Sequence, residues 1–354
     1  MRDFSYEARP GRVVFSAGAA RTRVAEEIER LGVRRLLVLT GKRGAWLAGD
    51  LTRPVADHVV AVFTGVRPHV PVEVADEAQA RAIAARVDAV LSIGGGSATG
   101  TAKAVALATG LPVIAIPTTY SGSEVTPMWG MTENGRKTTG IDSAALPRVV
   151  IYDPELTVPL PAGLSAVSGL NAMAHCVEAF WASGRNPISS LLAEEGIRAL
   201  AIGLPAVVAD GADIDARSEV LYAAYLAGSA FAGAGPGLHH RICHVLGGAY
   251  DLPHAETHAV VLPHVVAFNA AAAPVSAARI AAALGASDAA RGLRDLSRRL
   301  GVPTSLREIG LREEQLEDAA RSIQAVAPPD NPRPIGAGDL RRLLLAAWAG
   351  DGLE

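Results

Sequence analysis

The stretch Val87–Ser97 reads VDAVLSIGGGS and combines a strand, a turn and the start of a helix. Its apolar run is continuous, as expected for a strand covered on both faces of a parallel sheet. The three glycines let the backbone turn sharply and come close to a ligand. Helix-like residues follow directly, and the amide groups at a helix N-terminus favour a negatively charged group. The stretch therefore predicts a parallel α/β domain with an anion-binding turn at the end of a strand.

Similar signals on both sides of this stretch extend the pattern from residue 12 to residue 160. Strands are predicted at 12–16, 34–40, 59–64, 111–119 and 148–153, and helices at 19–31, 76–86 and 98–109. Strands that alternate with helices form a mainly parallel, doubly wound sheet. Within 129–139, the pair Asn134-Gly135 predicts a hairpin turn. We expect residues 1–160 to form an α/β dinucleotide-binding domain.

Residues 161–354 have a different character, because alanine- and leucine-rich runs replace the β-branched strands. Helices are predicted at 165–183, 187–209, 214–234, 237–247, 257–273, 275–284, 288–300, 313–325 and 338–349. Gly247-Gly248 is expected to end one of them, and Asp339 to act as the N-cap of the last. This half is therefore predicted to be an all-helical substrate and catalytic domain.

The composition is that of an ordinary globular protein: of 354 residues, 49% are hydrophobic and 19% are charged. The net charge of −3 and the pI of about 6.3 give no indication of binding to nucleic acid or to a membrane surface. No apolar segment has the length of a signal-peptide core or a membrane span, so a cytoplasmic protein is expected. Cys176 and Cys243 form no disulfide framework and are interpreted as buried packing residues. The alanine- and leucine-rich helical half favours a homodimer.

Three loops carry residues suited to a nucleotide, and each follows a predicted strand. Ligands of open α/β sheets bind beyond the carboxyl ends of the strands. The candidate cofactor-binding residues are Thr40, Lys42, Gly94, Gly95, Gly96, Ser97, Thr118, Thr119 and Ser123. No acidic residue occurs in Thr40–Arg43 to bind the ribose 2′-hydroxyl of NAD, whereas Lys42 and Arg43 suit a 2′-phosphate. We therefore expect NADH and/or NADPH as the cofactor.

Histidines gather in the run Gly237–His258, which reads GLHHRICHVLGGAYDLPHAETH. A helix at the start of this run would place His240 and His244 one turn apart on one face. Pro253 restricts the backbone directly before His254. His239 and His258, taken singly, are interpreted as ordinary core or surface residues.

An earlier helical segment repeats the spacing of the histidine run. Asn171 and His175 lie at positions i and i+4 in GLNAMAHCVEA. Two helices that each offer such a polar pair inside an apolar sequence are expected to form two walls of one pocket. The candidate pocket therefore contains His175, His240, His244 and His254.

Taken together, these motifs resemble the iron-containing alcohol dehydrogenase superfamily. The shared features are GGGS followed by Ala102-Lys103, then PTTYSGSEVTP, the helix with Asn171 and His175, and the H-x-x-x-H helix with a Pro-His ten residues on. The resemblance covers the chain from Arg12 to the last helix. It implies a dehydroquinate synthase-like fold, with an α/β domain and an all-α domain.

In metal-dependent members of the superfamily, an aspartate and three histidines bind iron or zinc. The positions that match them are Asn171, His175, His240 and His254, and His244 matches a further histidine near the substrate and the nicotinamide. The amide of Asn171 removes the anionic ligand, although three imidazoles could still hold zinc. Maleylacetate reductases resemble the same pattern and work without a metal, and Gly100 in place of a common acid also favours that subgroup. We therefore expect no metal.

The resemblance implies an oxidoreductase that uses NAD(P)H to reduce the C=C bond of maleylacetate, a small dicarboxylate, to 3-oxoadipate in the degradation of aromatic compounds. The residues expected to act in catalysis are His175, His240, His244, His254, Asn171 and Lys137. We expect His244 to deliver the proton and His240 and His254 to orient the substrate. Lys137 is a candidate for holding the cofactor or a substrate carboxylate. Without the aspartate, the histidine cluster is expected to be positive or easily protonated.

Three other functions stay open at this point. A metal-dependent alcohol or polyol dehydrogenase of the same superfamily would contain a bound metal. A cyclising lyase similar to dehydroquinate synthase would keep its NAD without net consumption. A non-catalytic nucleotide-binding protein would bind the cofactor without turnover.

Overall fold

The structure, a computed structural model, describes residues 4, 6–8, 11–133, 136–336 and 338–351. The chain divides into two compact units, Ala8–Leu160 and Pro161–Glu354 with Met1–Glu7. Each unit has its own hydrophobic core.

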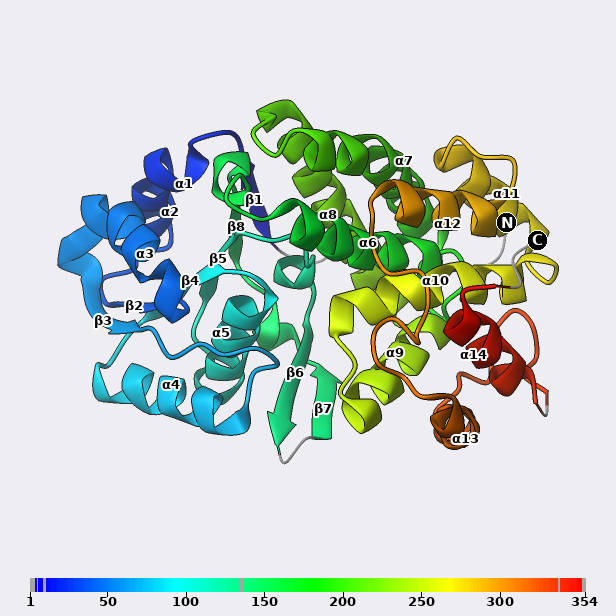
Figure 1. The fold of residues 1–354 in the computed structure, drawn as a ribbon. Helices are drawn as coiled ribbons and strands as arrows, with labels where there is room; N and C mark the ends of the chain where they lie inside the picture. Colours follow the sequence, from blue (N-terminus) through cyan, green and yellow to red (C-terminus); the bar gives the residue numbers. More distant parts are fainter. Residues whose placement is uncertain (1–3, 5, 9–10, 134–135, 337, 352–354) are drawn as a thin grey trace. The chain divides into compact units, whose positions relative to one another are not determined.

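Six parallel strands form the sheet of the first unit, in the order β1-β8-β5-β4-β2-β3 (Figure 1). They are β1 (Arg12–Phe15), β2 (Leu36–Leu39), β3 (Val59–Phe63), β4 (Ala89–Gly94), β5 (Val113–Pro117) and β8 (Val149–Tyr152). The helices are α1 (Ala19–Thr22), α2 (Val24–Arg30), α3 (Ala45–Thr52), α4 (Val72–Ala84) and α5 (Gly96–Thr109). Successive strand residues face opposite sides, so Leu36 and Val38 pack with α1, α2 and α3, whereas Leu37 and Leu39 pack with α4 and α5. The predicted doubly wound parallel sheet is confirmed.

The first unit differs from the prediction in its details. The helix predicted at 19–31 is two helices that meet at Arg23, where φ is −113°. Helix α4 begins at Val72, four residues earlier than predicted, and α3 was not predicted. A hairpin of β6 (Met128–Glu133) and β7 (Arg136–Ile141) is present as expected, with Glu133 opposite Arg136. The predicted turn residues, Asn134 and Gly135, lie outside the described residues.

The second unit is helical throughout its described part, as predicted. Its helices are α6 (Ala162–Glu178), α7 (Pro187–Ala209), α8 (Ile214–Ala234), α9 (Leu238–Tyr250), α10 (His254–Ala270), α11 (Pro274–Ala283), α12 (Ala289–Arg299), α13 (Leu316–Gln324) and α14 (Asp339–Ala349). Side-chain caps start several of them: Asn186 and Ser189 form a capping box on α7, and Asp213 and Asp288 cap α8 and α12. Buried residues of α9, α10, α13 and α14 share one core.

The helix predicted at 165–183 ends at Glu178, and the one predicted at 257–273 begins at His254. Two predicted helix-end residues are also wrong. Gly247-Gly248 does not end α9, which continues to Tyr250 and stops at Asp251, where φ is 53°. The helix can continue because it is anchored by its apolar face, which outweighs the small cost of two glycines. Asp339 is not the N-cap of α14, because Gly338, with φ 77°, takes that position. The Asp339 carboxylate instead accepts a hydrogen bond from the backbone N–H of Gly336 at 2.7 Å.

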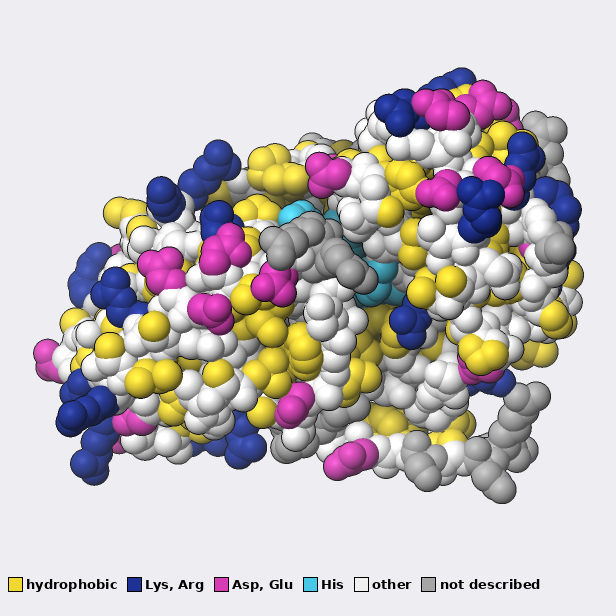
Figure 2. All heavy atoms as spheres, turned by 90° about the horizontal axis from the view of Figure 1, so that it is seen from below, with side chains coloured by type: hydrophobic (Ala, Val, Ile, Leu, Met, Phe, Trp, Pro, Cys, Tyr) yellow, Lys and Arg dark blue, Asp and Glu magenta, His cyan; other side chains and the backbone are white. Residues whose placement is uncertain are grey.

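The surface and the cysteines agree with the composition. Acidic and basic side chains are interspersed over the described residues on the face shown in Figure 2. Both cysteines are buried and free. Across the described part of the chain, no helix combines the length and the hydropathy needed to cross a bilayer.

Candidate active site

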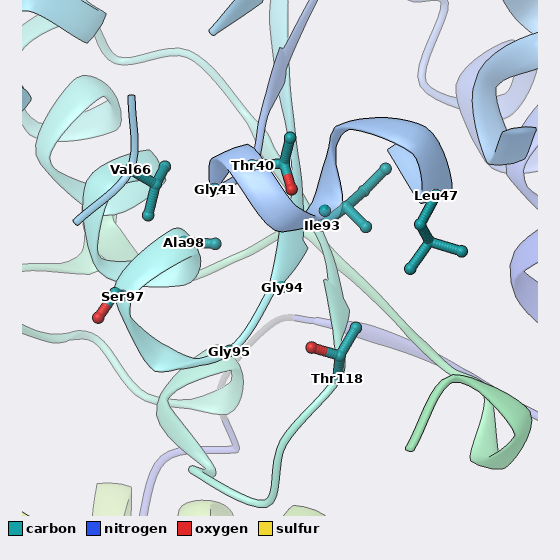
Figure 3. A pocket seen from close by; sticks show the side chains of 11 residues that line it. Thr40, Gly41, Leu47, Val66, Ile93, Gly94, Gly95, Ser97, Ala98 and Thr118 are labelled. Atoms are coloured by element: carbon teal, nitrogen blue, oxygen red, sulfur yellow. The ribbon is translucent and has the colours of Figure 1, made fainter. Parts of the chain in front are cut away.

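The glycine turn between β4 and α5 borders a cavity of about 230 Å³ in the first unit (Figure 3). The residues that line it are Thr40, Gly41, Gly44, Leu47, Val66, Ile93, Gly94, Gly95, Ser97, Ala98 and Thr118. Five of the predicted cofactor-binding residues are among them, whereas Lys42, Gly96, Thr119 and Ser123 are not. The apolar lining residues could not be found from the sequence, since near a strand they look like any other core residue.

The close packing of the turn explains its glycines. Gly94 has φ 148°, a conformation that other residues rarely adopt. A Cβ atom on Gly95 would lie 2.9 Å from Cγ2 of Thr119, so Thr119 supports the turn from outside the cavity lining. In Figure 3 the Thr118 hydroxyl points towards the turn, whereas that of Ser97 points away. A Cβ atom on Gly100 would lie 2.6 Å from Cγ2 of Val70, so a side chain at this position would require Val70 to move.

In the second unit, four helices bring six histidines and one phenylalanine together. His175 comes from α6, Phe231 from α8, His239, His240 and His244 from α9, and His254 and His258 from α10. The ring of His240 is at the centre, stacked on His175 at 5.0 Å between centroids and 4.5 Å from Phe231. His239, His244 and His258 contact the same ring edge-on. We call these seven residues the histidine cluster.

The four predicted histidines are therefore in one cluster, and two more join them. His239 and His258 are buried core residues, but the ring of His258 lies 4.8 Å from His240 and 4.4 Å from His254. Asn171 lies one turn before His175 on α6 and is half-buried. Lys137 lies on β7 in the first unit, where its side chain is exposed.

Several buried polar atoms in and beside the histidine cluster have no hydrogen-bond partner among the described residues. They are Oδ1 of Asn171, Nδ1 of His175, Nδ1 of His239, Nε2 of His240 and both ring nitrogens of His258. A buried polar atom without a partner costs roughly 1–3 kcal/mol. So many in one place indicate a site that receives a polar ligand or ordered water.

The expectation that the cluster is positive is wrong for its buried members. Burial lowers the pKa of His175 to about 3 and that of His239 to about 4. Burial also lowers the pKa of His240 and of His258 well below the usual value for histidine. The neighbouring imidazoles add to these shifts, because each opposes a second positive charge nearby. These shifts favour the neutral form of all four rings.

Glu178 is a residue of the site that the sequence reasoning missed. It lies one turn after His175 on α6 and is fully buried. Its carboxylate accepts a hydrogen bond from Nδ1 of His240 at 2.5 Å and two more from backbone N–H groups of Gly237 and His239. Burial raises the pKa of Glu178 to about 7, and the backbone hydrogen bonds oppose that shift. The only signal in the sequence was an acid three residues after a candidate histidine.

The ligand atoms of His239, His240 and His258 lie within 4.8 Å of one another. The resemblance implies another set of metal-binding histidines, namely His175, His240 and His254. The two sets share only His240. The group of His239, His240 and His258 contains no carboxylate, and the nearby carboxylate of Glu178 already accepts from three N–H donors.

Comparisons with known proteins agree with this architecture. Residues 10–154 match the family model described as iron-containing alcohol dehydrogenase, and residues 165–348 match that of the C-terminal part of the Fe-containing alcohol dehydrogenase family. The maleylacetate reductase of Burkholderia cepacia is 47% identical over 350 residues, which are 99% of both chains. The crystal structure of maleylacetate reductase from Agrobacterium tumefaciens is 48% identical, covers 99% of both chains and has a TM-score of 0.96.

A solved structure of 1,3-propanediol oxidoreductase is 30% identical, with 98% of this chain and all of that chain covered and a TM-score of 0.90. The matches thus extend over both units, from the glycine turn to the histidine cluster. The chain belongs to the iron-containing alcohol dehydrogenase family.

Proposed function

We propose that the protein is a maleylacetate reductase, which uses NADH or NADPH to reduce the C=C bond of maleylacetate and forms 3-oxoadipate. The observation that carries this function is the full-length similarity, 47% identity over 99% of both chains, to a relative that bears this name. A metal-dependent alcohol dehydrogenase is not favoured, because an amide occupies position 171.

The glycine turn fits the pyrophosphate of a dinucleotide. A side chain on Gly95 would collide with Thr119, so only glycine fits at this position. Without a side chain there, the backbone N–H groups at the start of α5 are accessible to a phosphate. Lys42 and Arg43 are exposed and form no ion pair among the described residues, which supports use of NADPH as well as NADH. Bound NADH or NADPH supplies the hydride, which adds to the alkene carbon β to the ketone.

The histidine cluster completes the reduction. As the hydride arrives, the electron pair of the C=C bond moves towards the ketone oxygen, and the resulting enolate takes a proton at the adjacent carbon. We assign that proton transfer to His244, which is half-buried on α9. His240 and His254 orient the substrate, and the negative charge of the bound dianion favours a proton on the ring nitrogen that faces it, which then donates to a substrate oxygen.

The family takes its name from iron, but the residues present here do not fit an iron site. Iron(II) sites in oxygen-activating enzymes combine imidazole with a carboxylate ligand, and position 171 offers an amide oxygen. The carboxylate of Glu178, which contacts the histidine cluster through His240, already accepts from three donors. We therefore propose a reduction in which no step passes through a metal.

Two carboxylates of the substrate need positive partners. Arg241 is exposed on α9, three residues before His244, and forms no ion pair among the described residues. We assign one substrate carboxylate to Arg241 because a guanidinium binds carboxylates through paired hydrogen bonds. Lys137 is a second candidate, for the cofactor or the other carboxylate.

The test is a spectrophotometric assay of NADH and NADPH oxidation with maleylacetate. We expect turnover with maleylacetate and none with simple alcohols and NAD⁺. His244→Ala is expected to lower kcat by roughly 10²- to 10⁴-fold, the usual contribution of general acid catalysis, with an unchanged unfolding temperature. Near-normal turnover of that variant would remove His244 from the mechanism, and no oxidation of either cofactor would reject the function.

We also propose a homodimer. Strand β1 is at the edge of the sheet and exposes Val13 and Phe15, and an unpaired apolar edge favours association. Light scattering after size-exclusion chromatography checks this, and a mass of 36.5 kDa at micromolar concentration would contradict it.

A further inference from the structure

Glu178 ties the start of α9 to the end of α6. Its carboxylate accepts hydrogen bonds from the N–H of Gly237 at 2.8 Å, the N–H of His239 at 2.6 Å and Nδ1 of His240 at 2.5 Å. Gly237 is the N-cap of α9, and the two histidines belong to its first turn. A carboxylate without exposed surface is tolerated when such donors surround it.

The bond to Nδ1 determines which nitrogen of His240 is left for other partners. Nε2 of His240 is buried and has no partner in the part of the chain that the structure describes. The ring also packs against His175 and Phe231, at centroid distances of 5.0 and 4.5 Å, and these two rings lie 4.5 Å from each other. With Nδ1 donating to Glu178 and the ring in contact with His175, Phe231 and the edge-on histidines, a rotation that exchanged the two nitrogens would break the bond to the carboxylate.

The absence of a side chain on Gly237 gives the Glu178 carboxylate the space it needs. A Cβ atom on Gly237 would lie 2.7 Å from Oε1 of Glu178 and 3.1 Å from its Cδ. The φ of Gly237 is −112°, which any residue adopts, so glycine is needed there for space and not for its backbone freedom. The start of α9 is therefore built to let the carboxylate approach.

We propose that Glu178 is a positioning residue of the reductase: its carboxylate holds the imidazole of His240 through Nδ1, so that Nε2 is the nitrogen turned to the substrate. The role of His240 towards the substrate rests on the proposed function, whereas the hydrogen bond between Glu178 and His240 does not. The positioning role of Glu178 differs from a purely structural role, because a helix cap needs only the backbone donors, whereas positioning needs the hydrogen bond to the ring.

The ring hydrogen bond is tested directly by NMR on the full chain labelled with ¹⁵N-histidine. The signals of His240 are assigned by their loss in His240→Asn. We expect a slowly exchanging, strongly downfield proton on Nδ1 of His240, as a short hydrogen bond to a buried carboxylate produces. A proton on Nε2 with a rapidly exchanging Nδ1 would overturn the proposal. The NMR measurement does not depend on enzyme activity, so it tests the hydrogen bond even if the maleylacetate assay rejects the proposed function.

The kinetic test uses Gly237→Ala, which displaces the carboxylate without removing it. We expect the downfield proton to disappear and kcat to fall roughly 10- to 100-fold, the scale seen when an orienting partner of a site histidine is lost. The KM for NADH is expected to stay within about twofold, since neither Gly237 nor Glu178 belongs to the glycine turn that we assign to the pyrophosphate. Gly248→Ala is the matched control, because it lies on the same helix and an added Cβ there meets no atom within 4 Å.

Conservative variants separate positioning from folding. Glu178→Asp keeps a carboxylate and is expected to retain more kcat than Glu178→Gln, whose amide cannot accept from all three donors. If Gly237→Ala and Glu178→Gln lower the unfolding temperature but leave kcat and the His240 signals unchanged, Glu178 is only a helix cap and the proposal is wrong.

Discussion

Gly95→Ala tests whether the glycine turn holds the cofactor. The added Cβ would lie 2.9 Å from Cγ2 and 3.0 Å from Oγ1 of Thr119. Ordinary contacts between such atoms are about 3.5–4.0 Å, so the variant is too crowded by roughly 0.5–1 Å. Thr119 is β-branched and cannot simply rotate away. The loop after β5 must therefore move away from the turn.

The magnitude follows from the cost of overpacking, which is about 1–3 kcal/mol. Without cofactor the loop can move outward and relieve most of the strain. With cofactor bound, the turn and the loop must keep their native positions, so most of the cost falls on binding. At 1.4 kcal/mol for each factor of ten, the dissociation constant of NADH is expected to rise roughly 5- to 150-fold.

Titration calorimetry with NADH measures this change. Gly49→Ala is the control, because Gly49 lies in α3 of the same unit and an added Cβ meets no atom within 4 Å. We expect the control to bind NADH like the unmodified protein. A dissociation constant within twofold for Gly95→Ala, with an unchanged unfolding temperature, would refute the assignment of the cofactor to this turn.

Three further predictions follow from single residues. Burial lowers the pKa of Lys103 from 10.5 to about 7, and the nearby charge of Glu124 opposes this shift. Between pH 7 and 10.5 the unfolded chain therefore keeps a proton on Lys103 that the folded chain has lost. The free energy of unfolding should rise with pH over this range. Lys103→Met should abolish that rise in urea unfolding at pH 7 and 9, and parallel pH curves for the two proteins would contradict this. Asn171→Asp should increase the zinc retained after dialysis, measured by mass spectrometry, because it adds an anionic ligand beside His175; equal zinc content would show that the amide is not what limits metal binding. Arg241→Ala should raise the KM for maleylacetate by at least ~10-fold with kcat within about twofold, the scale of one charge-assisted hydrogen bond, and an unchanged KM would exclude Arg241 as the carboxylate partner.

The sequence by itself determined the features that depend on near neighbours. The continuous apolar run before Gly94 predicted a buried parallel strand, because strand periodicity is a local property. The i, i+4 spacings of Asn171 with His175 and of His240 with His244 were correct, since both pairs lie within single helices. Where local signals misled, as at Gly247-Gly248, packing of the apolar face of α9 overrode the low helix propensity of glycine.

Only the tertiary structure decided how the histidine cluster is supported. Glu178 and its three donors are 59 to 62 residues apart in the chain, and no local pattern links them. The lowered pKa values of His175 and His240 could likewise not be predicted, because they depend on how completely neighbouring helices exclude water. Spacing along one helix sets which side chains share a face, but burial and long-range hydrogen bonds set their charge and orientation.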